Sequence, residues 1–242
     1  MSGLPAPLLT RDSAWTLLTE FTTSPVLIRH AVAVEAAMRG QATIYGGDIE
    51  YWGIVGLLHD FDFERYPTAE QHPFEGARIL RERGHGEEFV EDILSHARYS
   101  GVARVRPVQK SLFAVDELSG FITACALVKP SKSLSEIDPA GVRKKMRDKA
   151  FARAVSRDDI IDGAAELGVD LDAHVLVVVE SLKPVAAELG LTPNALAVEQ
   201  HRARRRLAEV LRAAVADTVA DAAEVEPELR HLLAILTQHG SL

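Results

Sequence analysis

Four potential metal ligands occur in the first half of this sequence: His30, the adjacent pair His59-Asp60, and Asp116. Neutral imidazole and carboxylate groups bind divalent transition metals, and a site requires several of them to converge on one point. Adjacent residues of a helix point about 100° apart, so His59 and Asp60 can reach one ion only where a helix ends. The apolar run before the pair and the polar segment after it predict such an end.

Asp116 has a different setting, because it lies among the apolar residues Ala114, Val115 and Leu118. An unpaired carboxylate in such surroundings would be costly to bury. We therefore expect Asp116 to have a partner, and a shared metal ion would provide one.

A separate histidine, an adjacent His-Asp pair and a distant aspartate together resemble the pattern of the HD superfamily of metal-dependent phosphohydrolases. His72 and His96 stand where dinuclear members carry two further histidines. Residues 115–122 and 142–151 also resemble an uncharacterised branch of predicted hydrolases, and the similarity fades near residue 190. The resemblance implies an all-α fold, with an HD-domain helical bundle over residues 1–190 and a C-terminal helical extension over 191–242.

The resemblance also implies how the ligands divide between metal ions. One ion would be held by His30, His59, Asp60 and Asp116, and a second by His72 and His96, with Asp60 bridging because a carboxylate has two ligating oxygens. The implied cofactor is one or two divalent transition-metal ions, and this ligand set suits iron, manganese, cobalt, nickel and zinc alike. Such ions would activate water for attack on the phosphorus of a small phosphorylated substrate.

Other charged residues could assist this chemistry, although each could equally be a capping or solvated surface group. Carboxylates that could accept protons or support histidine ligands, besides Asp60, are Glu35, Asp62, Glu64 and Glu117. Cations that could contact phosphoryl oxygens are Arg29, Arg98, Lys144, Lys145 and Lys149. Lys145 and Lys149 would share a helix face if the helix continues through both.

Two other functions remain open. The six-ligand pattern also resembles that of the HD-type mixed-valent di-iron oxygenases, and only the metal and its chemistry would separate the two. Alternatively, the chain is a non-catalytic helical interaction module, in which the run 202–206 and the apolar residues after it pack on a partner helix. A homo-oligomer formed through the C-terminal helices is one form of that interaction.

Apolar residues spaced by three and four predict helices throughout. We expect them at about 11–21, 25–39, 48–58, 73–83, 87–98, 108–128, 139–149, 159–168 and 171–189, then one long helix from 193 and a shorter one from about 224. Ser24-Pro25 and Asp138-Pro139 are typical helix starts.

Composition limits the alternatives further. The chain has 242 residues and a formal net charge of -8, which argues against nucleic-acid and anionic-membrane partners. No apolar run approaches the roughly 20 residues of a membrane span, and no signal-peptide pattern opens the chain, so a cytoplasmic location is expected. The single cysteine, Cys125, lies in an apolar run and is expected to be a buried hydrophobic residue rather than a nucleophile.

Overall fold

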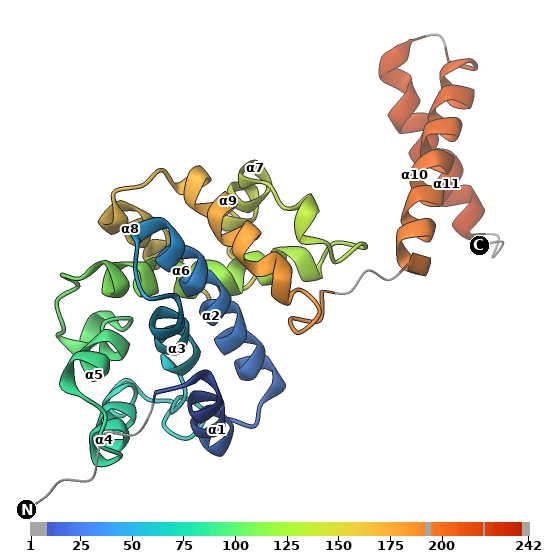
Figure 1. Ribbon diagram of the computed structural model, residues 1–242. Coiled ribbons are helices and arrows are strands. Elements are labelled where there is room, and N and C mark those ends of the chain that lie inside the picture. The colour runs from blue at the N-terminus through green and yellow to red at the C-terminus, as the bar shows by residue number, and fades with distance from the viewer. Residues whose placement is uncertain (1–8, 192–194, 220, 239–242) are drawn as a thin grey trace, which may run out of the picture. The chain divides into compact units, whose positions relative to one another are not determined.

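The computed structural model describes residues 9–191, 195–219 and 221–238, and every regular element in them is helical (Figure 1). The all-α fold expected from the sequence is confirmed. The chain divides into two compact units, residues 1–192 and 193–242. Among the described residues, no helix is both long and apolar enough to cross a membrane.

The first unit contains nine α-helices and three short 3-10 turns in its described part. The α-helices are α1 (Arg11–Phe21), α2 (Pro25–Tyr45), α3 (Ile49–Leu58), α4 (Phe74–Glu82), α5 (Glu87–Leu94), α6 (Pro107–Leu127), α7 (Pro139–Met146), α8 (Arg157–Leu167) and α9 (Leu171–Leu182). The turns are η1 (Arg98–Ser100), η2 (Leu134–Glu136) and η3 (Lys183–Val185).

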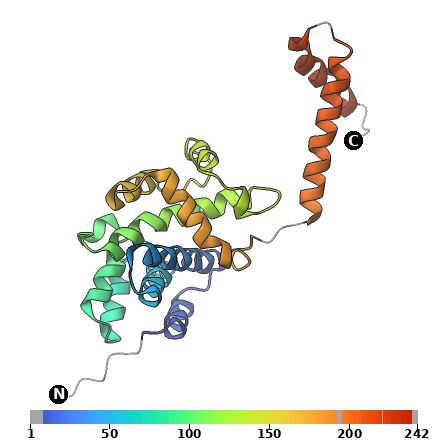
Figure 2. The same cartoon turned by 45° about the horizontal axis from the view of Figure 1, so that its top comes forward.

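Two long helices, α2 and α6, form the centre of this unit (Figures 1 and 2). Helix α2 packs against α3, α6 and α9, while α6 also packs against α8. The contact between α2 and α3 is close because Gly56 of α3 lies against the backbone of Val34, where a Cβ atom would be 2.9 Å from the carbonyl oxygen. This contact holds the end of α3 beside α2.

Helix α2 continues beyond the end expected near residue 39. Its last residue is Tyr45, and Gly46 follows in the left-handed conformation that commonly ends helices. Gly40 is an interior residue whose small size allows α9 to approach, because a Cβ atom there would lie 2.0 Å from the Ser181 hydroxyl oxygen. The glycine is therefore a packing residue rather than a helix stop.

Three other helices end earlier than expected. Helix α5 ends at Leu94, because the Ser95 hydroxyl and the His96 ring bond carbonyl oxygens of the preceding turn. Helix α7 ends at Met146, so Lys149 lies outside it. Helix α9 ends at Leu182, directly before Lys183-Pro184, because a proline restricts the residue before it.

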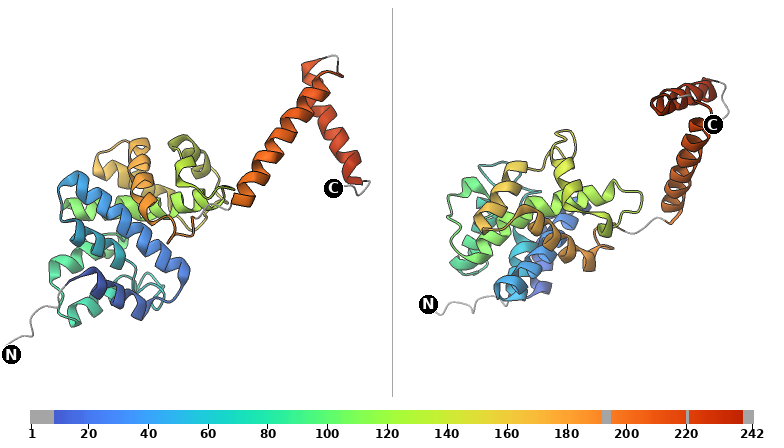
Figure 3. Two further views of the ribbon diagram at one scale, coloured as in Figure 1. Left: turned by 45° about the vertical axis from the view of Figure 1, so that its right-hand side comes forward. Right: turned by 90° about the horizontal axis from the view of Figure 1, so that it is seen from above.

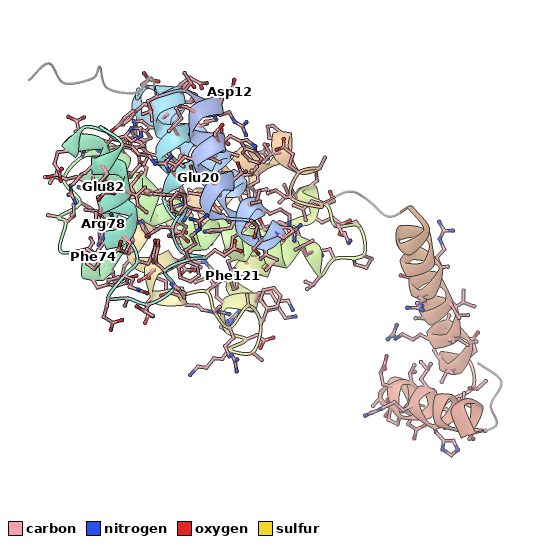
Figure 4. The ribbon with its side chains drawn as sticks, turned by 90° about the horizontal axis from the view of Figure 1, so that it is seen from below. Asp12, Glu20, Phe74, Arg78, Glu82 and Phe121 are labelled. Carbon is pink, nitrogen blue, oxygen red and sulfur yellow. The ribbon has the colours of Figure 1, made fainter. Side chains whose placement is uncertain are left out.

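Ion pairs lie on the solvent-exposed faces of the helices that surround this buried centre. Arg78 and Glu82, one turn apart on α4, pair at 2.6 Å (Figure 4). On the inner face of the same helix, Ala77 and Leu80 are buried in the core. Cys125 is also buried, as expected, and burial raises the pKa of its thiol to about 11.

The second unit is a helical hairpin of α10 (Ala195–Ala216) and α11 (Val225–Gln238), with the turn η4 (Ala222–Glu224) between them (Figure 3). The long helix expected from residue 193 therefore ends at Ala216. An ion pair at 2.6 Å between Arg212 and Glu226 links the end of α10 to the start of α11.

Candidate metal centre

The six expected ligands come from separate elements of the first unit. His30 lies in α2 and Asp116 in α6, while His59 follows the last residue of α3 as its C-cap. Asp60 lies in the turn after His59, so the chain leaves the helix at the point the sequence indicated. His72 lies in the segment before α4, and His96 in the turn after α5.

Three of these residues form a first cluster. Ligand atoms of His30, His59 and Asp116 all lie within 4.8 Å of one another. The Asp116 Oδ1 atom is 3.0 Å from His30 Nε2 and 3.3 Å from His59 Nε2. Asp116 thus has the partners that its apolar surroundings require.

A second cluster consists of Asp60, His72 and His96. Asp60 Oδ1 lies 3.1 Å from His72 Nε2 and 3.2 Å from His96 Nε2. Its other oxygen, Oδ2, lies 3.4 Å from Nε2 of His59 in the first cluster. The Asp60 carboxylate therefore lies between the two clusters, with one oxygen directed to each.

Hydrogen bonds on the far side of two rings orient their Nε2 atoms toward the clusters. The Nδ1 atom of His59 lies 2.8 Å from the Gly56 carbonyl oxygen, and that of His96 lies 2.7 Å from the Ile93 carbonyl oxygen. A carbonyl only accepts, so each Nδ1 carries a proton, and in the neutral form of each ring the Nε2 atom has a free lone pair. Metal-binding histidines commonly have this arrangement.

The Nε2 atoms of these histidines converge, as the ligand atoms of a metal site must. The Nε2 atom of His59 is buried and has aspartate oxygens at 3.3 and 3.4 Å, but it makes no hydrogen bond of good geometry with them, which is costly for a buried polar atom that has no ligand. The Nε2 atoms of His72 and His96 face each other at 3.1 Å. These convergent lone pairs, together with the two carboxylates, fit a divalent transition metal.

The electrostatics of the clusters follow from burial and ion pairing. Burial opposes charge on Asp60 and Asp116, but the nearby histidines outweigh it and hold the pKa of each carboxyl below its usual range. Burial likewise opposes charge on His59, yet the two aspartates raise its pKa well above normal. The pKa of His72 rises to about 9, since hydrogen bonds to Asp60 and Asp62 outweigh its burial. Metal binding here must therefore displace protons.

A cavity of about 400 Å³ opens onto both clusters. Besides five of the six candidate ligands, the residues that line it are Phe63, Ala97, Arg98, Tyr99, Phe113, Glu117, Ala154, Val155 and Asp159. The cavity offers space for a small molecule beside the candidate metal positions.

The structure brings two of the other expected carboxylates to this region. Asp62 is buried and lies 2.8 Å from Nδ1 of His72, so it supports a histidine rather than facing the cavity. Glu117 lines the cavity, and burial together with the adjacent Asp116 carboxylate raises its pKa to about 8.

Two expected catalytic carboxylates lie elsewhere. Glu35 is buried in ion pairs with Arg11 and Arg39 beside a different cavity of about 560 Å³. Glu64 bonds the backbone N–H groups of Thr23 and Ser24, just before α2 begins. Both carboxylates have structural partners, and neither lines the cavity at the two clusters.

Of the expected phosphate-binding cations, Arg98 alone lines the cavity in the described part of the chain. Its guanidinium bonds Asp159 and Asp162 and lies 4.9 Å from the centre of the Phe113 ring. The four that do not line the cavity are Arg29, Lys144, Lys145 and Lys149. Lys145 instead lies 4.5 Å from the centre of the Phe151 ring, and the end of α7 removes the helix face it was expected to share with Lys149.

Several lining residues were not identified from the sequence. Tyr99 lies in η1, while Ala154 and Val155 come from the segment before α8. Arg157 holds that segment, since it donates hydrogen bonds of 2.6 Å to the carbonyl oxygens of Ala152 and Val155. These residues are aromatic or small and follow no spacing rule, so the sequence contains no signal that would identify them.

No protein-family model matches this chain, and a search of curated proteins finds none similar to it. The first unit is helical and brings together His/Asp groups close enough to bind metal, which is compatible with an HD-type centre.

Proposed function

We propose that the protein is a metal-dependent phosphohydrolase that cleaves a phosphate ester of a small metabolite. The observation that carries this proposal is the position of Asp60, whose two oxygens face the two separate clusters of ligands. When bound, divalent ions at such clusters lower the pKa of water and stabilise negative charge on phosphoryl oxygens.

The chain's own residues would position the ions and the substrate. The backbone carbonyls of Gly56 and Ile93 fix the rings of His59 and His96, so little reorganisation is needed on binding. Asp60 and Asp116 stay ionised because their pKa values are held low. Phe63, which meets the His72 ring edge-on with centres 5.2 Å apart, provides an apolar wall beside the clusters.

The charges around the cavity narrow the class of substrate. Arg98 is the lining cation in the described residues, and two carboxylates already neutralise it. A chain of several phosphates would leave negative charge with no cation from the protein to balance it. A substrate with one phosphoryl group is therefore the better match.

The test is metal analysis of the purified protein combined with a phosphate-release screen over nucleoside monophosphates and sugar phosphates. His59→Ala and Asp60→Ala should each lose bound metal and at least 100-fold in turnover, because they remove ligands. His231→Ala, which changes an exposed histidine in the second unit, is the matched control. Full turnover in either ligand variant would refute the assignment.

The same scarcity of free cations favours a second candidate, an HD-type mixed-valent di-iron oxygenase, because oxidation of a substrate needs no phosphate-binding arginine. The two are separated by measuring dioxygen uptake by the iron-loaded protein and phosphate release by the manganese-, cobalt- or nickel-loaded protein. Oxygen uptake without phosphate release would replace the hydrolase by the oxygenase. Metal binding with neither activity would indicate a structural site.

A further inference from the structure

Tyr99 carries the one hydroxyl among the described residues that line the cavity beside the two clusters. Its side chain is 52% exposed, so it lies at the open side of the cavity rather than in the core. The hydroxyl has no hydrogen-bond partner among the described residues. The Tyr51 hydroxyl, by contrast, donates a 2.7 Å hydrogen bond to Asp92 within the fold. Tyr99 therefore provides the cavity with a donor that the fold itself does not use.

The backbone on both sides of Tyr99 is fixed to neighbouring elements. Before it, Arg98 pairs with two aspartates of α8. After it, Gly101 ends the turn η1 in the left-handed conformation, and Arg104 pairs with Glu166 of α8 at 2.6 Å. A tyrosine side chain has only two rotatable bonds, so little conformational entropy is lost when its hydroxyl is ordered on a ligand.

The charges that act on the Tyr99 hydroxyl place it on the side of the second cluster. Partial burial raises the pKa of the phenol, and the negative charges of Asp60 and Asp62 raise it further. Asp60 belongs to the second cluster, and Asp62 supports the His72 ring of the same cluster. The raised pKa keeps the hydroxyl protonated at neutral pH, so it can donate a hydrogen bond to an anion.

The other polar groups that line the cavity already have partners. The histidine Nε2 atoms face the two clusters, and Arg98 is paired with Asp159 and Asp162. Glu117 accepts a hydrogen bond from the backbone N–H of Ser156. A phosphoryl group carries negative charge on several oxygens, and a hydrogen-bond donor stabilises an oxygen that no metal ion contacts. Such a donor has to come from a side chain that is not already paired.

We propose that Tyr99 is a substrate-binding residue whose hydroxyl donates a hydrogen bond to a terminal phosphoryl oxygen. The inference rests on the proposed function for the identity of the ligand and adds to it how the phosphoryl group is recognised. A hydrogen bond to an ionised acceptor is stronger than one between neutral groups, so a hydroxyl can replace the cation that Arg98 does not supply. The bond forms with the ester and with product phosphate alike, so its loss should weaken the binding of both and change turnover little.

The first test is calorimetric titration of inorganic phosphate into the metal-loaded, full-length protein. Tyr99→Phe removes only the hydroxyl and should weaken phosphate binding about tenfold, as expected for the loss of a hydrogen bond to a charged group. Tyr45→Phe is the matched control, because Tyr45 is 39% exposed and does not line the cavity. Its phosphate affinity should equal that of the wild type. Metal content should be the same in all three proteins, since neither tyrosine is a candidate ligand.

The second test separates the hydroxyl from the aromatic ring. Tyr99→Phe should raise KM for a hydrolysed phosphate monoester about tenfold and leave kcat within about threefold of the wild type, because it removes binding that substrate and transition state share. Tyr99→Leu removes the ring as well and should raise KM by the same factor. A larger increase in Tyr99→Leu, with wild-type KM in Tyr99→Phe, would assign recognition to the ring and overturn the proposal.

The remaining outcomes separate this inference from the hydrolase proposal. Wild-type phosphate affinity and KM in Tyr99→Phe would overturn the role of Tyr99 and leave the hydrolase intact. If the wild type cleaves no ester but binds phosphate more tightly than Tyr99→Phe, the hydrolase proposal fails and the binding role of Tyr99 stands. A metal-loaded wild type that neither binds phosphate nor releases it from any ester would overturn both.

Discussion

The carboxylate of Asp62 accepts a hydrogen bond from Nδ1 of His72 at 2.8 Å and another from the backbone N–H of Gly76 at 2.8 Å. Asp62 is buried, and Gly76 permits the contact because a Cβ atom there would lie 2.8 Å from the carboxyl carbon. Asp62 therefore fixes the ring of His72 so that its Nε2 atom faces Asp60.

Replacing this carboxylate should weaken metal binding without removing a ligand. We expect Asp62→Asn to lower metal affinity by about 10–100-fold, the usual effect of losing a partner of a ligating histidine. Titration calorimetry with manganese or zinc measures the change. Glu64→Gln, two residues away and bonded to Thr23, is the matched control. Equal affinities in Asp62→Asn and the wild type would mean that His72 needs no such support.

Metal stoichiometry should show the division of ligands between the two clusters. His96→Ala removes a ligand from the second cluster alone, so it should lose one of two ions and keep the other. Asp60→Asn weakens both clusters, because the carboxylate faces each of them, and should lose both ions. Elemental analysis after dialysis gives the counts. Loss of both ions in His96→Ala would indicate that the clusters bind metal cooperatively, and an unchanged count would exclude that cluster as a site.

The sequence predicts the two clusters of candidate ligands, because imidazole and carboxylate side chains are read directly from residue order and the His59-Asp60 pair stands at a visible helix end, although His30 and Asp116 lie within helices. It predicts other site residues poorly. Glu35 follows His30 by five positions, which turns it about 140° away on the same helix, so helical geometry alone argues against its catalytic role. The neutralisation of Arg98, unlike the position of Glu35, could not be judged from helical geometry. It depends on contacts with Asp159 and Asp162, which are more than 60 residues away in the sequence. No local pattern reveals such contacts.

The start of α2 was predicted correctly because a local cap decides it, whereas its end was predicted wrongly because packing decides it. Pro25 begins α2, in agreement with the prediction, since a proline at the first helical position is a local feature. Gly40 does not end that helix, because its role is to admit Ser181 of α9. A glycine that stops a helix and a glycine that allows close packing are identical in sequence, so the three-dimensional structure is needed to distinguish them.

Asp92 should give the protein a measurable pH dependence of stability. It is fully buried, accepts a 2.7 Å hydrogen bond from the Tyr51 hydroxyl and pairs with Arg106. Burial outweighs these partners and raises the pKa of Asp92 to about 6. A raised carboxyl pKa means that the folded state binds the proton more tightly, so this contribution to stability is complete below about pH 4 and is lost as pH rises through 6.

The measurement is the free energy of unfolding in urea between pH 4 and 7 for the wild type and Asp92→Asn. The wild type should lose about 1–3 kcal/mol relative to the variant across this interval, because the variant has no proton to release. Glu91→Gln changes an exposed neighbouring carboxylate by the same one charge and serves as the control. A constant difference between the wild type and Asp92→Asn would contradict the shifted pKa.

Two glycines should respond oppositely to a methyl group. At Gly163 of α8, a Cβ atom would lie 2.6 Å from Cα of Ala114 in α6, so Gly163→Ala should destabilise the fold by about 1–3 kcal/mol. At Gly120 of α6, the nearest atom is Nδ1 of His30 at 3.6 Å, so Gly120→Ala should stabilise the helix by about 0.5–1 kcal/mol. Chemical denaturation compares the two variants. Equal stabilities would show that α6 and α8 can separate at little cost.

A substitution of Asp159 tests whether Arg98 binds phosphate once Arg98 is released from this ion pair. Arg98 donates to Asp159 and Asp162, so Asp159→Asn removes one of its two anionic partners and one negative charge from the cavity lining. Binding of inorganic phosphate to the metal-loaded protein should tighten by about fivefold, equivalent to about 1 kcal/mol for one charge in a partly solvated site. Asp158→Asn is the control, because Asp158 is exposed and does not line this cavity. Calorimetry measures both affinities. Weaker phosphate binding in Asp159→Asn would instead show that Asp159 holds Arg98 in the orientation that phosphate requires.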